Sequence, residues 1–378
     1  MGDAGDTRGI PLARPVIGRP EEEAVLAVLR SGQLSLGPRL GAFEERFARH
    51  LGVAHASAVS SGTAGLHLAV RAAGVSDGDE VVTSPFSFVA SANAVVFERA
   101  RPVFADIDPR TLTLDPEAAA AAVTERTAAV LPVHIFGWPC AMEPLEALGL
   151  PIVEDACEAL GARHPDGAAV GARGHPAVFA FYANKQLTTG EGGMVTTGSA
   201  AVKVRIDSER NQGRAPDMAW LDHDRLGFNY RLSDIACALG LAQLDRLDGM
   251  LADRAGVAGL YREALGGIEE LELPCPDAGG AVRGWFVFVV QLPRGVDRDA
   301  TIRALGERGI QSKPYLPAIH LMSYYRERFG HREGEFPVCE DVADRSVALP
   351  FFPGMTEDQV ARVAGALAGV LGRSPAIG

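Results

Sequence analysis

Hydrophobic residues fall into short runs and helical repeats up to about residue 250. Apolar runs typical of buried strands occupy 80–88, 100–107, 128–137, 150–156, 177–183 and 193–197. Helical spacing marks two helices within 20–51, one within 60–74 and one at 233–251, and further helices lie between strands at 88–100 and 116–125. This alternation predicts an α/β fold, with a mostly parallel central sheet and helices on both faces.

The pattern changes after about residue 250. An apolar run at 285–292 and helices at 297–309 and 356–371 predict a smaller C-terminal α+β domain. We place the boundary at the end of the helix 233–251, which gives a large domain at 10–250 and a small domain at 251–378. Residues 1–9 are polar, lack the apolar core of a signal peptide and are expected to form a disordered tail.

Composition excludes several classes of protein. The chain has 378 residues, of which 47% are hydrophobic and 22% charged, as in an ordinary folded protein, and no apolar run approaches the ~18 residues of a membrane helix. A net charge of −12 disfavours nucleic-acid binding but allows a local pocket for an anionic ligand. The five scattered cysteines include no C-x-x-C pair, so neither zinc nor a disulfide framework is indicated, and a cytoplasmic location is expected.

Lysine usage draws attention to one position. Only three of the 36 basic residues are lysines, namely Lys185, Lys203 and Lys313. Arginine cannot lose its proton in proteins, so a lysine retained by such a chain can mark a need for an amine nucleophile. Lys185 follows the strand at 177–183 and precedes a glycine-rich turn, where a cofactor can approach closely. By position alone, a solvent-facing loop lysine is the stronger alternative.

Three other features precede Lys185. Asp155 ends the run 150–156, where an acid can keep a pyridinium nitrogen protonated, although it can also cap a helix starting at 156. Residues 61–64 open a helix whose N–H groups can bind an anion, although such caps are common. Phe88 follows a strand and can stack on an aromatic ring or pack in the core. Each feature is weak alone, but their order and spacing match fold-type I pyridoxal-phosphate (PLP) enzymes.

The chain resembles the DegT/StrS family of sugar aminotransferases from about residue 10 to 370. The motifs that carry the resemblance include SSGTAGLHLA, EDACEALGA, NKQLTTGEGGMV and GFNYRLSDIACALGLAQL. The resemblance implies a fold-type I transferase with pyridoxal 5'-phosphate as cofactor, in which Lys185 forms the Schiff base and moves the proton while Asp155 binds the pyridine nitrogen. It further implies that the cofactor is held by Gly62, Thr63 and Ala64 at the phosphate and by Phe88 at the ring.

The resemblance also implies a homodimer with shared active sites. Asn229 is expected to reach the phosphate of the partner subunit, and Arg231 in the same loop is expected to meet an anionic group. Substrate contacts are expected from the early loop, the motif PVHIFG and the segment around residue 320, although a purely structural role is equally open for each residue: Ser35, His134, Tyr315 and His320.

Two positions depart from the family pattern. Ala180 stands where the family usually has a serine that binds the phosphate, so one hydroxyl donor is lost. Glu158 stands where many members have His or Gln against the phenolic oxygen of the cofactor. An ionised Glu158 would repel that oxygen, so its side chain is expected to be neutral, partnered or turned away. Glu158 and the C-terminal segment resemble the perosamine-type members, which act on 4-keto sugars.

The expected reaction is transfer of an amino group, from L-glutamate, to the C4 keto carbon of a nucleotide-linked keto-deoxyhexose. A 3-keto sugar or a cyclitol ketone is the alternative substrate, and an aminohydroxybenzoate is the product of a side branch of the family. A PLP-dependent sugar dehydratase is disfavoured because such relatives replace the lysine, and a non-catalytic PLP-binding regulator because the Lys–Asp pair is intact. A nicotinamide enzyme is disfavoured because no G-x-G-x-x-G motif follows the first strand.

Overall fold

The computed structural model describes residues 9–215 and 222–372, so the predicted tail at 1–9 lies outside it except for Gly9. The strands of the larger sheet are β1 (His55–Val59), β2 (Glu80–Thr83), β3 (Arg101–Phe104), β4 (Thr127–Leu131), β5 (Glu154–Asp155), β6 (Ala177–Ala180) and β7 (Gly193–Thr197). Parallel bridges from Val130 to Ile152 and from Val133 to Asp155 join β4 to β5. The resulting order is β3-β2-β4-β5-β6-β7-β1.

All neighbouring strands of this sheet are parallel except β7, which runs antiparallel to both β6 and β1. The carboxyl ends of the parallel strands therefore lie along one edge of the sheet. Ligands of open α/β sheets bind at that edge. The predicted α/β fold, with a mostly parallel sheet, is confirmed.

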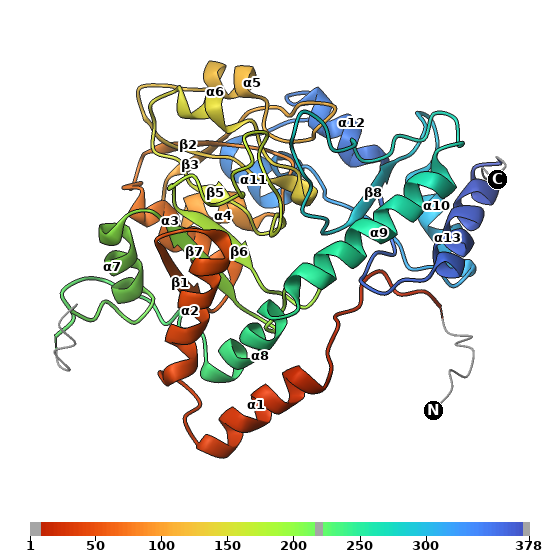
Figure 1. Cartoon of the computed structure of the whole chain (residues 1–378). Coiled ribbons are helices and arrows are strands. Elements are labelled where there is room, and N and C mark those ends of the chain that lie inside the picture. The colour runs from red at the N-terminus through yellow and green to blue at the C-terminus, as the bar shows by residue number, and fades with distance from the viewer. Residues whose placement is uncertain (1–8, 216–221, 373–378) are drawn as a thin grey trace.

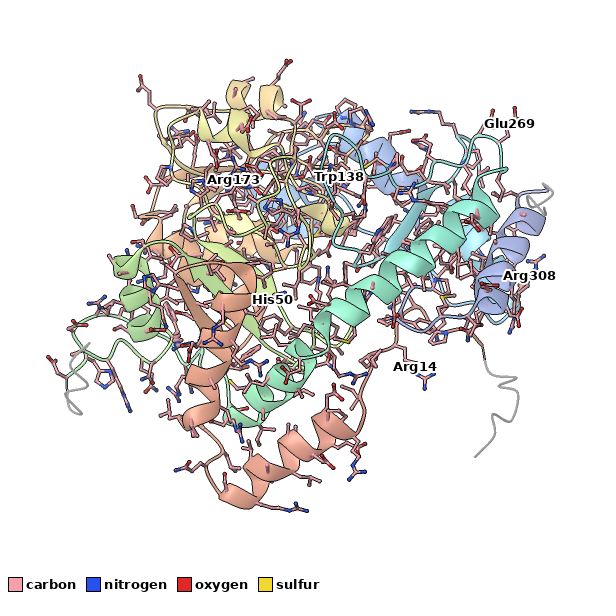
Figure 2. The ribbon with its side chains drawn as sticks, viewed as in Figure 1. Arg14, His50, Trp138, Arg173, Glu269 and Arg308 are labelled. Carbon is pink, nitrogen blue, oxygen red and sulfur yellow. The ribbon has the colours of Figure 1, made fainter. Side chains whose placement is uncertain are left out.

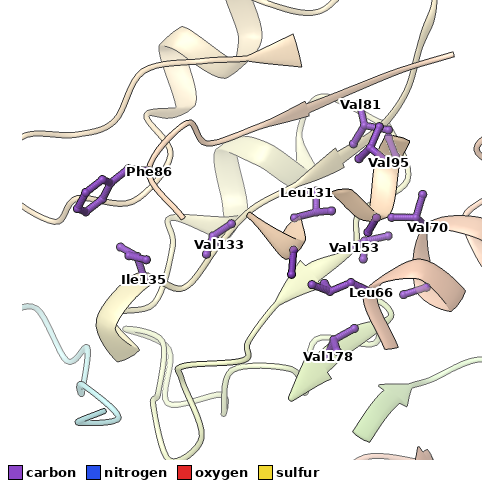
Figure 3. Close-up of a cluster of buried hydrophobic side chains, with 14 of the residues drawn as sticks. Leu66, Val70, Val81, Phe86, Val95, Leu131, Val133, Ile135, Val153 and Val178 are labelled. Atoms are coloured by element: carbon purple, nitrogen blue, oxygen red, sulfur yellow. The ribbon is translucent and has the colours of Figure 1, made fainter. Parts of the chain in front are cut away.

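Helices cover both faces of the sheet (Figure 1). One face carries α3 (Gly62–Ala72), α4 (Ala90–Phe97) and α7 (Ala200–Glu209); the other carries α2 (Pro38–Leu51), α5 (Pro116–Ala121), α6 (Met142–Glu146) and α8 (Asp234–Leu244). Successive side chains along a strand point to opposite faces of the sheet. In β6, Val178 packs with Leu66 and Val70 of α3 (Figure 3), whereas Phe179 packs on Phe47 of α2 on the other face.

The C-terminal part forms a second, smaller layer structure. Its elements are α9 (Leu247–Leu265), β8 (Phe288–Gln291), α10 (Arg298–Glu307), β9 (Lys313–Pro314), α11 (Ser323–Phe329), α12 (Pro337–Arg345), β10 (Ser346–Leu349) and α13 (Glu357–Val370). The antiparallel sheet β8-β10-β9 shares an apolar core with α9 and α13. The N-terminal helix α1 (Arg19–Ser31) packs against α8.

The predicted helix at 233–251 is wrong in its limits. It divides into α8, which ends at Leu244, and α9, which starts at Leu247 and continues to Leu265. The domain boundary near residue 250 therefore falls inside α9 and stays a prediction. Strand β1 and helix α7 were not predicted from the sequence.

Many charged side chains lie at the outside of the molecule, as Arg14, Glu269 and Arg308 do in Figure 2, whereas Trp138 is buried. Within residues 9–215 and 222–372, no helix combines the length and the apolar character needed to cross a membrane.

Candidate active site

A cavity of about 380 Å³ lies at the carboxyl edge of the large sheet. Residues that follow β2, β4, β5 and β6 line it, together with the start of α3, and Phe286, Tyr315 and Leu316 of the C-terminal part complete its wall. It brings together seven residues predicted from the sequence: Gly62, Thr63, Phe88, Asp155, Glu158, Lys185 and Tyr315. The fold therefore gathers most of the predicted cofactor residues into one place.

Lys185 points into this cavity rather than into solvent. Its Nζ lies 3.4 Å from Oε1 of Glu158 and 3.9 Å from the ring centroid of Phe286, and its side chain is 13% exposed. The next residue, Gln186, is buried and its Nε2 donates to the carbonyl oxygen of Glu158 at 2.6 Å. The alternative of a solvent-facing loop lysine is wrong, and the amine is placed for chemistry with a bound molecule.

Asp155 is held from two sides at the end of β5. Its Oδ2 accepts a hydrogen bond from Ser91 Oγ at 2.6 Å, and its Oδ1 accepts one from the Cys157 backbone N–H at 3.1 Å. Ser91 Oγ also lies 2.7 Å from Oγ of Ser87. The alternative of a helix cap is wrong, because residues 156–162 form tight turns and no helix. The buried carboxylate is therefore oriented for a partner in the cavity.

The start of α3 forms the turn predicted to bind phosphate. Ser61 caps the helix, since its Oγ accepts from the Ala64 backbone N–H at 3.0 Å. A Cβ on Gly62 would lie 2.7 Å from Cβ of Ala180 and 3.1 Å from Sγ of Cys157, so only glycine fits there without a shift. Free N–H groups at a helix N-terminus, reached across a glycine, suit a phosphate.

Phe88 presents an aromatic ring to the cavity. Its side chain is 60% exposed, although residues on either side of it are buried or partly buried. An exposed ring on a cavity wall is suited to stacking on a flat ligand. The alternative of core packing is wrong for Phe88.

Glu158 lies beside Lys185 in a dry environment. Its Oε2 accepts a hydrogen bond from the Phe136 backbone N–H at 3.0 Å, and Phe136 has a positive φ of 52°. Burial raises the pKa of Glu158, while the Lys185 amine opposes that rise. Burial, and then Glu158, raise the pKa of Tyr315. The carboxyl group is therefore partnered, and its neutral form is favoured by burial.

Similarity to known proteins identifies the class of this site. The DegT/DnrJ/EryC1/StrS aminotransferase family matches residues 15–368. The chain belongs to this family. It is 39% identical over 368 residues to the spore coat polysaccharide biosynthesis protein SpsC of Bacillus subtilis (strain 168), covering 93% of this chain and 94% of SpsC. The resemblance inferred from the sequence motifs is thus confirmed.

Solved structures of related proteins share the fold. DesV of S. venezuelae is 35% identical with a TM-score of 0.87, covering 92% of this chain and 93% of DesV. A 3-amino-5-hydroxybenzoic acid synthase is 30% identical with a TM-score of 0.90, covering 97% of this chain and 100% of the synthase. The fold is that of the fold-type I PLP enzymes, and this aminotransferase uses pyridoxal 5'-phosphate as its cofactor. The Gly62 turn, the oriented Asp155 and the inward Lys185 fit that group.

The other predicted residues of the aminotransferase lie outside the cavity wall. Ala64 is buried in the first turn of α3, while Ser35 and Asn229 are exposed. Arg231 lines a neighbouring hollow with Ser60 and Glu191, and Glu191 also lines the cavity. Roles for Ser35, Asn229 and Arg231 in binding stay predictions.

The predicted substrate contacts of His134 and His320 do not fit the structure of this aminotransferase. Both side chains are fully buried and neither lines the cavity. Nδ1 of His134 accepts from the Cys140 backbone N–H at 3.0 Å, and its Nε2 lies 3.1 Å from Oε2 of Glu154. Nε2 of His320 lies 3.0 Å from Oε1 of Glu340. Their hydrogen bonds hold the protein interior together instead.

Sequence reasoning missed several residues of the aminotransferase site. Ser91 orients Asp155, Phe286 covers the Lys185 amine, and Tyr182 and Cys157 line the cavity. None belongs to a pattern with a chemical meaning of its own, because each acquires its place only from the tertiary fold. Ser91 lies in the first turn of α4 whereas Ser87 precedes that helix, so their contact depends on the folded loop before α4.

Proposed function

We propose that this aminotransferase moves an amino group from L-glutamate to the keto carbon, at C4, of a nucleotide-linked keto-deoxyhexose. The observation that carries the proposal is the convergence of Lys185, Asp155 and the Gly62 turn on one cavity. The relative SpsC is named for polysaccharide biosynthesis, which supports a sugar substrate. Glu158 and the segment around residue 320, which resemble the perosamine-type members, support C4 over C3.

The roles of the two central residues follow from their placement. When bound, the cofactor withdraws electrons from the carbon that carries the amino group. Asp155, fixed by Ser91 and Cys157, stabilises positive charge on the pyridine nitrogen by its own negative charge. Lys185 would hold the cofactor until the amine of the amino donor displaces it, and the freed Lys185 amine would then take the proton from the reacting carbon and return it at the next position.

The cavity wall separates polar from apolar groups. Phe286, Tyr315 and Leu316 provide a mainly apolar side, while Glu158 faces Lys185. The neutral form of Glu158, favoured by burial, can donate a hydrogen bond to the cofactor or the sugar. A neutral Glu158 would not repel the phenolic oxygen of the cofactor, which supports a place for Glu158 in the site.

We further propose a homodimer in which Asn229 completes the site of the partner. The segment 228–231 pairs with the chain at Ser60, whose N–H donates to the Tyr230 carbonyl at 2.8 Å. Phe228 and Tyr230 stack together at 5.0 Å and pack against His67, whereas Asn229 is exposed. Asn229 is thus presented outward from a rigid support. A partner subunit would also cover the exposed ring of Tyr182 at the cavity mouth.

We place the enzyme in the cytoplasm. Its five cysteines are all free, as expected where thiols stay reduced.

The test is a substrate screen in two stages. The purified enzyme is first converted by L-glutamate, with release of 2-oxoglutarate, and is then offered 4-keto and 3-keto nucleotide sugars, a cyclitol ketone and free keto-deoxyhexose. The proposal expects amination of the 4-keto nucleotide sugar with the highest kcat/KM. Preference for a 3-keto sugar or a cyclitol would overturn the C4 position. Amination of none of the offered sugars by the glutamate-treated enzyme would overturn the sugar as substrate.

A further inference from the structure

Arg254 is a buried cation without an acidic partner. It lies in α9, is 3% exposed, and has no carboxylate within ion-pair distance among residues 9–215 and 222–372. Burial lowers the pKa of its guanidinium to about 10, so the group still carries its charge at neutral pH. A buried charge without a counter-ion is costly, so its retention calls for a reason.

The guanidinium bridges two carbonyl groups from distant parts of the chain. Nη1 donates to the Phe286 carbonyl at 3.0 Å, and Nη2 donates to the Lys185 carbonyl at 3.4 Å. The carbon of the guanidinium also lies 5.7 Å from the ring centroid of Phe351. The planar fork of arginine can serve two acceptors at once, which a lysine ammonium on one flexible stem does less well.

The two bridged residues meet again through their side chains. Nζ of Lys185 lies 3.9 Å from the ring of Phe286, inside the cavity. A second tie runs between the same segments, because Gln186 Nε2 donates to the Gly284 carbonyl at 3.1 Å. Hydrogen bonds from Arg254 and Gln186 therefore join the loop after β6 to the segment before β8. The side chains of Lys185 and Phe286, which belong to these two segments, line the cavity.

We infer that Arg254 is a positioning residue, which sets the Lys185 amine against Phe286 by fixing the two main chains. The inference rests on the proposed role of Lys185. This role gives a reason for a charged group next to Lys185 without an acidic partner. The guanidinium supplies hydrogen-bond donors to two main-chain carbonyl oxygens, which would lose these donors if Arg254 were replaced. Arg254 itself does not line the cavity.

The test uses the small number of lysines. Cofactor-free protein is treated with formaldehyde and a mild borohydride, and methylation of Lys185, Lys203 and Lys313 is followed by peptide mass mapping. Lys313 is exposed and Lys203 is paired with Asp207 and Glu44, so both serve as internal references. In Arg254→Met, Lys185 should react about tenfold faster relative to Lys313, because the two hydrogen bonds that join its main chain to that of Phe286 are lost.

Two further variants separate positioning from charge and from general stability. Arg254→Lys keeps the charge but not the fork, so Lys185 should again react faster than in the wild type. Arg345→Met is the control, because Arg345 is also buried and donates to a main-chain carbonyl, that of Leu292, and neither residue lines the cavity; unlike Arg254, it also pairs with Asp341 and Glu272. It should lower Tm and leave the Lys185 ratio unchanged. In the holoenzyme, Arg254→Met should lower kcat at least tenfold with KM within about threefold.

An unchanged or slower Lys185 reaction in folded Arg254→Met would overturn the inference. So would an Arg254→Lys variant with the wild-type ratio, or an equal change in Arg345→Met. If Arg254→Met does not fold, Arg254→Lys alone decides between the outcomes. Failure of the proposed function is distinguishable, because the wild-type holoenzyme would then show no glutamate-dependent reaction, whatever the lysine ratios are.

Discussion

Asp155 illustrates how a single side chain is prepared for its role. Replacing it with Asn should preserve the hydrogen bond from Ser91 but remove the charge that stabilises the protonated pyridine nitrogen. Activity should fall by roughly 10²-fold or more, as for other electrostatic catalytic groups, with little change in Tm. Steady-state kinetics and thermal unfolding measure the two quantities. A variant within a few-fold of the wild type would show that Asp155 is only structural.

Ser91→Ala should show a smaller loss of activity than Asp155→Asn, because it removes only the hydrogen bond that orients Asp155.

Glu158 should impose its own pH dependence on the cofactor-free protein. Burial raises its pKa above the ordinary value of 4.5. Between 4.5 and the raised pKa, the folded protein keeps a proton that the unfolded chain has lost, so the free energy of unfolding falls as pH rises through that window. Glu158→Gln should abolish this decrease, as measured by denaturant unfolding at a series of pH values.

A control with the opposite sign is available in Glu80. Hydrogen bonds from Thr124 and Arg126 lower its pKa, so its contribution is lost as pH falls through the lowered value. Glu80→Gln should therefore flatten the acid limb instead. Parallel stability curves for the wild type and Glu158→Gln would contradict the assignment of Glu158.

At the level of single residues, the sequence predicted side chains whose type and position match a known catalytic role. It missed side chains that act only by contacting another residue in the folded protein. Lys185 and Asp155 could be found because an amine and an acid follow apolar runs at family spacing. Arg254 could not be found, because one arginine in an ordinary helix resembles any other until the fold places it under Lys185. His134 was expected at the site, but only the neighbouring Val133 lines the cavity, while the ring of His134 is fully buried and contacts Glu154.

At the scale of elements, the N-terminus of α3 depends on close packing. Gly62→Ala should force apart the turn and β6, because the new Cβ would lie 2.7 Å from that of Ala180. We expect a loss of about 1–3 kcal/mol in the free energy of unfolding, the usual range for overpacking, and weaker binding of pyridoxal phosphate. Denaturant unfolding and cofactor titration measure the two effects.

Gly41→Ala is the control for this variant. Gly41 lies in α2, and nothing lies within 4 Å of an added Cβ there, so the substitution should be neutral or slightly stabilising. Ala180→Gly should partly restore the Gly62→Ala variant by removing the nearest atom. Normal cofactor affinity in Gly62→Ala alone would contradict the phosphate-binding role of this turn.

Most elements with clear apolar patterns were predicted, whereas the unpredicted ones are β1, α6, α7, β9, α11, α12 and β10. Strand β1 escaped because its sequence, HASAV, consists mainly of small residues and carries little strand preference. The break between α8 and α9 has no glycine or proline at residues 245–246 to announce it. Arg246 leaves helical geometry there, and its Nη1 pairs with Glu21 of α1 at 2.8 Å, a contact more than 200 positions away that the sequence pattern does not announce.

At the scale of the whole molecule, the proposed dimer predicts complementation between inactive subunits. Lys185→Ala lacks the reactive amine, and Asn229→Ala lacks the predicted phosphate ligand of the partner site. A hybrid dimer has one site in which both residues are present, so co-refolded mixtures should regain up to about a quarter of the wild-type activity per site if subunits mix at random. Each homodimer alone should stay inactive or nearly so.

The assembly must be verified for that result to have meaning. Differently tagged subunits allow isolation of hybrids, and light scattering reports their mass. No recovery in purified hybrids, or a fully active monomer, would rule out the shared site. The assignment of Lys185 would survive that outcome, since it rests on the cavity within one chain.

The most direct test of the central claim is the absorbance spectrum of the purified enzyme during titration with L-glutamate. The wild type should show a visible band from pyridoxal phosphate joined to Lys185, and L-glutamate should remove that band with release of one equivalent of 2-oxoglutarate per site. Lys185→Ala should lack the band and show no turnover, because Lys203 and Lys313 do not line the cavity. Transamination near the wild-type rate in Lys185→Ala would contradict the account.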